Sequence, residues 1–314
     1  MRIVFCGTPE FAVPTLQHLL GLPELEIAAV ITQPDRPRGR GHEISAPPVK
    51  QAALAAGLPV HQPAKIRSQE ALELVARLAL DAVVIIAYGQ IIPAALLAIP
   101  RHGWINLHAS LLPKYRGAAP INWALVHGES VSGLTTMRID AGMDTGEILL
   151  KQRMEIGPAE TAPALAARMA QAGAPLMAQT LRRLRDASIT PRAQNPAEAT
   201  YAPLLKREDG RIRWDLAAQE IFNRIRGFDP WPGAFTTFRG QLCHIWGAPL
   251  AGASSATPGH ILRSGANVHV ACGGGTLLRL DGVKLEGRRR ITAQEFADGA
   301  PLAAGDSFEP APHA

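Results

Sequence analysis

The first half of the chain alternates short apolar runs with helical patterns, and this alternation constrains the fold more than any other feature. Apolar runs at residues 2–6, 26–32, 58–62 and 81–87 are each followed by apolar residues at helical spacing. Strands that alternate with helices are typical of right-handed crossovers in a mainly parallel sheet with helices on both faces. We therefore predict a doubly wound α/β domain.

The second half has a different pattern. An alanine-rich helical stretch near residues 161–185 is followed by a segment without apolar periodicity that contains three prolines, which is typical of a linker. Beyond it, short strands separated by turns, one of them expected at Asp281-Gly282, predict a small antiparallel β-barrel. The last fifteen or so residues, rich in Ala, Pro and acidic residues, are expected to fray. The predicted boundaries are 1–189 for the first domain, 190–206 for the linker and 207–314 for the second domain.

Charge and cysteine content narrow the class of protein. The 314-residue chain has a net charge of +5, and residues 201–290 hold 13 basic and 7 acidic side chains. This excess permits an anionic partner but does not require one. Three widely separated cysteines are too few for a disulfide scaffold and lack the spacing of a zinc site. The cysteines therefore favour a reducing, cytoplasmic compartment, and we predict no metal. No apolar run reaches the ~18 to 20 residues of a membrane span, which predicts a soluble protein.

The turn after the first strand disfavours a nucleotide-binding enzyme. Gly7 is followed by Thr8, Pro9 and Glu10, so neither the glycine pattern of a dinucleotide site nor that of a P-loop is present. The chain also lacks the G-x-S-x-G pattern of a serine nucleophile, and none of its cysteines lies beside a cluster of basic residues that would lower its pKa. We therefore expect the attacking nucleophile to belong to a substrate.

Two polar residues mark the end of a predicted strand at 103–108. Asn106 and His108 are two residues apart, so they share a face of the strand at its carboxyl end, where open α/β sheets bind ligands. An amide and an imidazole can both donate hydrogen bonds to an oxyanion that forms when a carbonyl is attacked. The alternative is a hydrogen-bonded core histidine beside an asparagine that ends the strand.

An acidic loop follows, with aspartates at Asp140 and Asp144. Their spacing resembles a calcium loop, but the twelfth position is Lys151 and not the bidentate glutamate that such a loop requires. One of the aspartates can instead orient His108, stabilise its imidazolium form or relay protons through water. The alternative is that both aspartates only cap turns.

Arginines gather at two places. Residues 33–42 predict a long loop that carries Arg36, Arg38 and Arg40, and a second cluster is Arg288, Arg289 and Arg290, with Lys284 nearby. Arginine can contact phosphates or read guanine edges, although most such clusters are only solvated.

Six segments, in order, resemble the methionyl-tRNA formyltransferase family over nearly the full chain. They are VFCGTPEFAVPTL, QPDRPRGRG, VVIIAYGQIIP, INLHASLLPKYRGAAPINWAL, GMDTG and RGFDPWPGAF. The resemblance implies a Rossmann-like catalytic domain that takes a formyl group from 10-formyltetrahydrofolate, and an OB-like second domain that helps to bind tRNA. It implies a translation-initiation enzyme that formylates the α-amino group of initiator methionyl-tRNA, and we expect it to act as a monomer.

The resemblance also assigns roles to residues. Asn106, His108 and Asp144 match the catalytic trio of folate-dependent formyltransferases, which favours Asp144 over Asp140. Arg38 stands where the family often has a small residue, which leaves open how much of the loop contacts phosphate. Folate-binding positions are Ser110, Leu111, Leu112, Pro113, Tyr88 and Gly89, and tRNA-binding positions are Arg36, Arg38, Arg40, Lys206, Arg288 and Arg289.

Three other functions stay open at this point. A formyltransferase that acts on a small amine, such as an aminosugar nucleotide or glycinamide ribonucleotide, would share the trio, although the arginine loop and the barrel disfavour it. A non-catalytic RNA-binding protein would use the basic loop and the barrel alone. A nicotinamide dehydrogenase is disfavoured by the missing glycines.

Overall fold

The computed structural model describes residues 1–38, 43–300, 302–303 and 305–309, and Arg40 lies outside them. Contacts within the chain divide it into two compact units. The first unit holds residues 1–120, 131–155 and 165–203, and the second unit holds 121–130, 156–164 and 204–314. The two short segments 121–130 and 156–164, which precede the linker in sequence, therefore pack with the C-terminal part. The division at 1–189, 190–206 and 207–314 stays a prediction.

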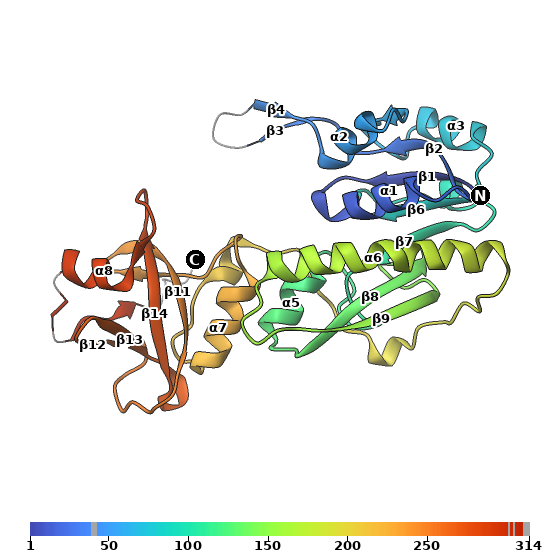
Figure 1. Cartoon of the computed structure of the whole chain (residues 1–314). Coiled ribbons are helices and arrows are strands. Elements are labelled where there is room, and N and C mark those ends of the chain that lie inside the picture. The colour runs from blue at the N-terminus through green and yellow to red at the C-terminus, as the bar shows by residue number, and fades with distance from the viewer. Residues whose placement is uncertain (39–42, 301, 304, 310–314) are drawn as a thin grey trace. The chain divides into compact units, whose positions relative to one another are not determined.

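The first unit is built on one seven-stranded sheet in the order β5-β2-β1-β6-β7-β8-β9 (Figure 1). The first five of these strands are parallel, and β8 and β9 run antiparallel at one side. This confirms the predicted doubly wound, mainly parallel sheet. The strands are β1 (Arg2–Gly7), β2 (Glu26–Ile31), β5 (Val60–His61), β6 (Ala82–Ile86), β7 (Trp104–His108), β8 (Val131–Arg138) and β9 (Ile148–Glu155).

Helices cover both faces of this sheet because the central strands are apolar throughout, and β1 and β6 are buried along nearly their whole length. Ser68 caps α3, since its hydroxyl accepts a hydrogen bond from the Ala71 amide at 3.3 Å. Gly173 in α6 lets this helix approach β7 closely, because a Cβ there would lie 2.4 Å from Leu107. The helices are α1 (Val13–Leu20), α2 (Pro48–Ala55), α3 (Gln69–Arg77), α4 (Ala94–Leu97) and α6 (Ala162–Arg185).

The second unit contains an antiparallel sheet in the order β12-β13-β14-β11-β10-β16, with β15 beside β14. A bridge between His260 and Ser307 joins its two outer strands, so the sheet closes on itself as the predicted small barrel does. The strands are β10 (Phe235–Phe238), β11 (Gln241–Leu250), β12 (Ile261–Ser264), β13 (Asn267–Ala271), β14 (Leu277–Leu285), β15 (Ile291–Thr292) and β16 (Phe308–Glu309), and the helices are α5 (Pro120–Val126), α7 (Ala218–Gly227) and α8 (Ala293–Gly299).

Three local predictions are wrong. No turn separates two strands at Asp281-Gly282, because β14 runs through it and the register shift opposite Trp246 and Gly247 absorbs the extra residue as a bulge. The C-terminal stretch does not fray as a whole, since Phe308 pairs with β10 and is 1% exposed in the barrel core. The segment after β2 is not only a loop, because β3 (Arg36–Arg38) pairs with β4 (Glu43–Ser45) as a two-stranded ribbon.

Candidate active site

Strand β7 carries Asn106 and His108 to the carboxyl end of the parallel part of the sheet. Asn106 lies between Ile85 of β6 and Met137 of β8 in the register, and its side chain is half-buried. Among the described residues its carboxamide has no hydrogen-bond partner. Polar groups in protein interiors usually have a hydrogen-bond partner, so an amide that has none within the described part of the chain is a candidate donor to a ligand.

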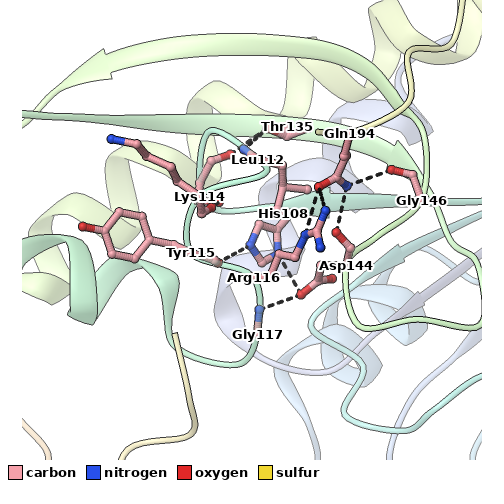
Figure 2. Close-up of polar contacts among 11 residues, drawn as sticks. His108, Leu112, Lys114, Tyr115, Arg116, Gly117, Thr135, Asp144, Gly146 and Gln194 are labelled. Atoms are coloured by element: carbon pink, nitrogen blue, oxygen red, sulfur yellow. Dashed lines mark hydrogen bonds and ion pairs between the residues drawn. The ribbon is translucent and has the colours of Figure 1, made fainter. Parts of the chain in front are cut away.

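The imidazole of His108 is held from one side and faced by a charge on the other. Its Nε2 lies 2.9 Å from the Tyr115 carbonyl oxygen, so Nε2 carries the proton and donates it there. Its Nδ1 lies 3.7 Å from Oδ2 of Asp144, within ion-pair range but beyond a hydrogen bond (Figure 2). The ring is therefore oriented by the Tyr115 carbonyl, and Nδ1 is the nitrogen left to act on a substrate.

Asp144 is distinguished from Asp140 by its contacts. Its Oδ2 accepts a hydrogen bond from the Gly117 amide at 2.8 Å, and its backbone φ of 52° lies in the left-handed region that few residues except glycine adopt. Asp140 instead caps its own turn, since its Oδ1 accepts from the Gly142 amide at 3.0 Å and from the Thr145 hydroxyl at 2.7 Å. The turn-capping alternative thus describes Asp140, while Asp144 faces His108.

Gln194 holds the acidic loop in place, and sequence reasoning did not single it out. Its Nε2 donates to the carbonyl oxygens of Asp144 and Gly146, both at 2.8 Å, as Figure 2 shows. Its Oε1 accepts from Arg116 Nε at 3.0 Å and from the Arg116 terminal nitrogen at 2.7 Å. Arg116 is 4% exposed, and a buried charge needs hydrogen-bond partners. Gln194 Oε1 supplies the acceptor for two of its guanidinium nitrogens.

Residues 190–206, which include Gln194, were predicted as a linker, but they also hydrogen-bond to the backbone beside His108. The amide of Tyr115 donates to the Thr200 hydroxyl at 2.8 Å, and the amide of Arg116 donates to the Thr200 carbonyl at 2.8 Å. The segment thereby fixes the backbone that orients His108. The only local signal in the sequence was a glutamine among prolines, which no motif distinguishes.

The positions implied to bind folate are mostly buried. Ser110 is fully buried and its hydroxyl donates to the Lys114 carbonyl at 2.6 Å. The Leu112 side chain packs against Met137 and Ile148. Tyr88 is 2% exposed with its hydroxyl unpartnered in the core, and burial raises the pKa of that hydroxyl. These three side chains are therefore already packed within the protein. Pro113 is also buried, Leu111 is half-buried, and Gly89, which has a φ of 88°, is exposed on the loop after β6.

The predicted tRNA-binding residues divide between the units. Arg36 stands exposed on the β3–β4 ribbon of the first unit, with one terminal nitrogen 3.2 Å from the Gln33 side chain. The backbone of Arg38 lies on the same ribbon. Lys206, Arg288 and Arg289 are exposed in the second unit, and Arg289 lies 3.8 Å from Glu295.

Other groups give no sign of a protein nucleophile or a metal. Burial raises the pKa of the Cys243 and Cys272 thiols to about 12 and also raises that of Cys6, so none is a thiolate at neutral pH. Within the part of the chain that the structure describes, no three His, Cys, Asp or Glu side chains gather as a metal site. None of its helices there has the length and apolar character needed to cross a bilayer.

Comparison with known proteins shows the family of this chain. Residues 1–181 match the formyl transferase family model and residues 204–301 match the model of the formyl transferase C-terminal domain. The chain is similar to the methionyl-tRNA formyltransferases of Solibacter usitatus, at 54% identity over 96% of each chain, and of Acidobacterium capsulatum, at 52% identity over 96% of this chain and 98% of the relative.

Solved structures show the same fold at lower identity. A sugar 3N-formyl transferase crystallised with dTDP and 5-N-formyl-THF has a TM-score of 0.67 at 17% identity, and the match covers 92% of this chain and 99% of that one. An N-formyltransferase from Helicobacter canadensis, in complex with folinic acid and dTDP-3-aminofucose, has a TM-score of 0.65 at 17% identity and covers 88% and 98%.

Proposed function

Because the chain belongs to the formyl transferase family, we propose that it transfers a formyl group from 10-formyltetrahydrofolate to the α-amino group of methionine on initiator methionyl-tRNA. The observation that supports the chemistry is the arrangement at the end of β7, where Asn106 is half-buried and the His108 ring lies between the Tyr115 carbonyl and the Asp144 carboxylate. The observation that carries the acceptor is the full-length similarity to relatives with this name.

The reaction needs charge stabilisation more than a strong base. An α-amino group has a pKa of roughly 7.7 to 8.0, so part of it is neutral and nucleophilic near pH 7. Its attack on the formyl carbon forms a C–N bond, an ammonium and an oxyanion. In the protein, Asn106 donates to that oxygen through its free amide, and His108 in its imidazolium form donates through Nδ1. The bond from the formyl carbon to the folate nitrogen then breaks.

Proton movement completes the balance. The ammonium must lose one proton and the leaving folate nitrogen must gain one. Asp144 Oδ2 lies 3.7 Å from Nδ1 of His108, and its carboxylate can pass the proton through water. The Gly117 amide holds Oδ2 of Asp144 in place for this role. In this scheme Asp144 acts on the proton, while the Tyr115 carbonyl sets the ring orientation.

The residues present fit a folate donor. The backbone of residues 110–113 follows directly after β7, and Gly89 follows β6, so both border the end of the sheet at which Asn106 is free. Bound there, the donor would supply the formyl carbon. We also propose that residues 1–189 perform the chemistry, that residues 207–314 help to bind the tRNA, and that the protein acts as a monomer.

Transfer of a labelled formyl group tests the proposal. The purified chain is given radiolabelled 10-formyltetrahydrofolate with initiator methionyl-tRNA, with uncharged initiator tRNA, or with an aminosugar nucleotide. We expect label only on methionyl-tRNA. Label on the aminosugar nucleotide but not on methionyl-tRNA would contradict the proposed acceptor while supporting formyl transfer as the reaction. Binding of tRNA without transfer to any amine would indicate a non-catalytic RNA-binding protein.

A further inference from the structure

A cavity lies in the second unit, and none of the catalytic or folate-binding residues named above lines it. It has a volume of about 290 Å³ and is formed by the turn 229–233 and the outer faces of β11 and β14. This volume is near the lower end of small-molecule pockets, which run from ~300 to 1,000 Å³. Its lining includes the turn residues 229–233 together with His244, Trp246 and Lys284.

The alternation of β11 explains why aromatic side chains line it. Cys243 and Ile245 point into the barrel core and are at most 1% exposed, so His244 and Trp246 lie on the outer face. The rings of His244 and Trp246 are 6.4 Å apart. Burial and the charges of Lys284 and Arg207 lower the pKa of His244, so its ring is neutral at neutral pH.

The opposite wall is a short, rigid turn. Pro230 and Pro232 fix the backbone on either side of Trp231, and Gly233, with a φ of 74°, sits so close to His244 that a Cβ would lie 2.8 Å from Nδ1. Trp231 is 54% exposed. This exposure is unusual, because tryptophan side chains are mostly buried in folded proteins. The turn thus presents the exposed Trp231 ring to solvent, next to the half-buried rings of His244 and Trp246.

Cations border the aromatic groups. Lys284 stands opposite His244 across β11 and β14. The Arg290 guanidinium lies 4.2 Å from the centre of the Trp246 ring, and Gly282 leaves room for it, because a Cβ there would lie 2.9 Å from Arg290 Nε. Asp229 adds a single carboxylate to the lining. A carboxylate repels a phosphate but accepts hydrogen bonds from the amino group of a base.

We infer that this pocket binds one unpaired nucleotide of the RNA partner, with its base stacked on Trp231 and its phosphate near Lys284 and Arg290. Proteins recognise RNA mainly where bases are unpaired, by stacking on aromatic rings or guanidinium planes, while lysine and arginine contact the backbone. A flat aromatic wall, a neutral imidazole and cations at the rim match that chemistry. The inference rests on the proposed function for the identity of the RNA.

The test compares three variants of the full chain for binding to uncharged initiator tRNA. Stacking of one base is worth ~1 to 3 kcal/mol, so we expect Trp231→Ala to raise Kd on the order of tenfold and Trp231→Phe to restore most of the affinity. Leu204→Ala is the matched control, because Leu204 is also exposed in the second unit, at 72%, and lies outside the pocket. It should leave Kd unchanged.

Salt dependence separates stacking from charge. Trp231→Ala should leave the slope of log Kd against log salt unchanged, whereas Lys284→Ala should reduce that slope by about one. Dimethyl sulfate or carbodiimide probing of the tRNA should show a base that the wild-type protein protects and Trp231→Ala exposes. If Trp231→Ala has an unchanged Kd and an unchanged protection pattern while the wild type transfers the formyl group, the pocket does not bind a nucleotide, and the proposed function still holds. If the wild type transfers no formyl group, the proposed function is wrong.

Discussion

The polar groups around His108 and those around Trp231 differ in how much of their bonding capacity the protein already uses. Around His108, the ring, the Asp144 carboxylate and the Gln194 amide are held by 2.7 to 3.0 Å contacts with backbone or with Arg116. Around Trp231, the aromatic and cationic side chains are partly open to solvent. The polar groups around His108 are already hydrogen-bonded within the protein, whereas the side chains around Trp231 keep part of their surface open to a partner.

The difference follows from what each site must do. A group that stabilises a developing charge acts best when it needs no reorganisation during the reaction, and fixed dipoles in a buried site satisfy this. A surface that binds a large polyanion draws on many exposed contacts, each worth little alone. Loss of one buried contact should therefore have a large effect on turnover, and loss of one exposed contact a small effect on affinity.

The largest expected effect is at the buried site. Asn106→Ala removes the free amide donor, and His108→Ala removes the Nδ1 donor. Each should lower kcat by roughly 10²- to 10³-fold, the usual effect of losing one oxyanion donor. Single-turnover formyl transfer at saturating substrates measures this.

Asn267→Ala is the matched control, because Asn267 is an exposed asparagine on β13 of the second unit. Its kcat should equal that of the wild type. Wild-type turnover by Asn106→Ala would remove this residue from the mechanism.

The next effect tests whether the network around Gln194 positions the site. Gln194→Ala leaves the Arg116 guanidinium buried without its partner, which should lower the free energy of unfolding by ~1 to 3 kcal/mol. It also frees the loop that carries Asp144, so kcat should fall on the order of tenfold with little change in the KM for tRNA. Thermal unfolding and steady-state kinetics give the two values.

Gln194→Glu separates the two contributions. A glutamate still accepts from Arg116, so much of the stability should return, but it can no longer donate to the carbonyl oxygens of Asp144 and Gly146. The kcat should therefore stay low. A variant with restored stability and restored kcat would show that Gln194 has only a structural role.

A smaller effect is expected at two arginines of segment 33–42, Arg36 on the ribbon and Arg40, which lies outside the described residues. Arg40→Ala and Arg36→Ala should each raise the KM for tRNA a few-fold at unchanged kcat and reduce the salt slope of tRNA binding by about one. Titrations at several salt concentrations check this. An unchanged KM and slope in both variants would indicate that these side chains are only solvated.

The smallest effect is at the base of the ribbon and depends on pH. Hydrogen bonds from Gln62 and Lys50, both at 2.7 Å, lower the pKa of Asp35 below 3.8. The native state thus favours the carboxylate, so its contribution to stability is complete above the unfolded pKa of 3.8 and is lost as pH falls through the lower native value.

Asp35→Asn should consequently lower the melting temperature slightly at neutral pH, and the gap to the wild type should narrow toward about pH 3. Lys50→Gln is a second variant that removes one of the two partners and should give part of the effect. A gap that widens on acidification would contradict the assigned direction.

Much of the fold could be predicted from the sequence because the period of the apolar residues is a local property. The strands and helices that alternate through residues 2–108 are confirmed by the sheet order and by its parallel strands. The errors came where a local pattern had two physical outcomes. Asp281-Gly282 can form a turn or a bulge, and only pairing with β11 decides between them. Phe308 looked like part of a polar tail, but the barrel buries it.

The candidate site shows the same limit. Asn106 and His108 lie two residues apart on one strand, so the sequence alone could place them on a common face. The choice of Asp144 over Asp140 came from family resemblance, because the spacing of the two aspartates in the loop does not show which of them faces His108. Gln194 contacts Asp144 across 50 residues of chain, and no local rule connects them.

The sequence by itself therefore determined which segments became strands and helices, and which polar groups stood at the end of the central strand. Tertiary structure alone decided which nitrogen of His108 is held by the Tyr115 carbonyl, which aspartate faces the ring, and which glutamine braces the acidic loop. The physical reason is range: side-chain periodicity acts over a few residues, whereas hydrogen bonds between distant segments exist only after the chain has packed.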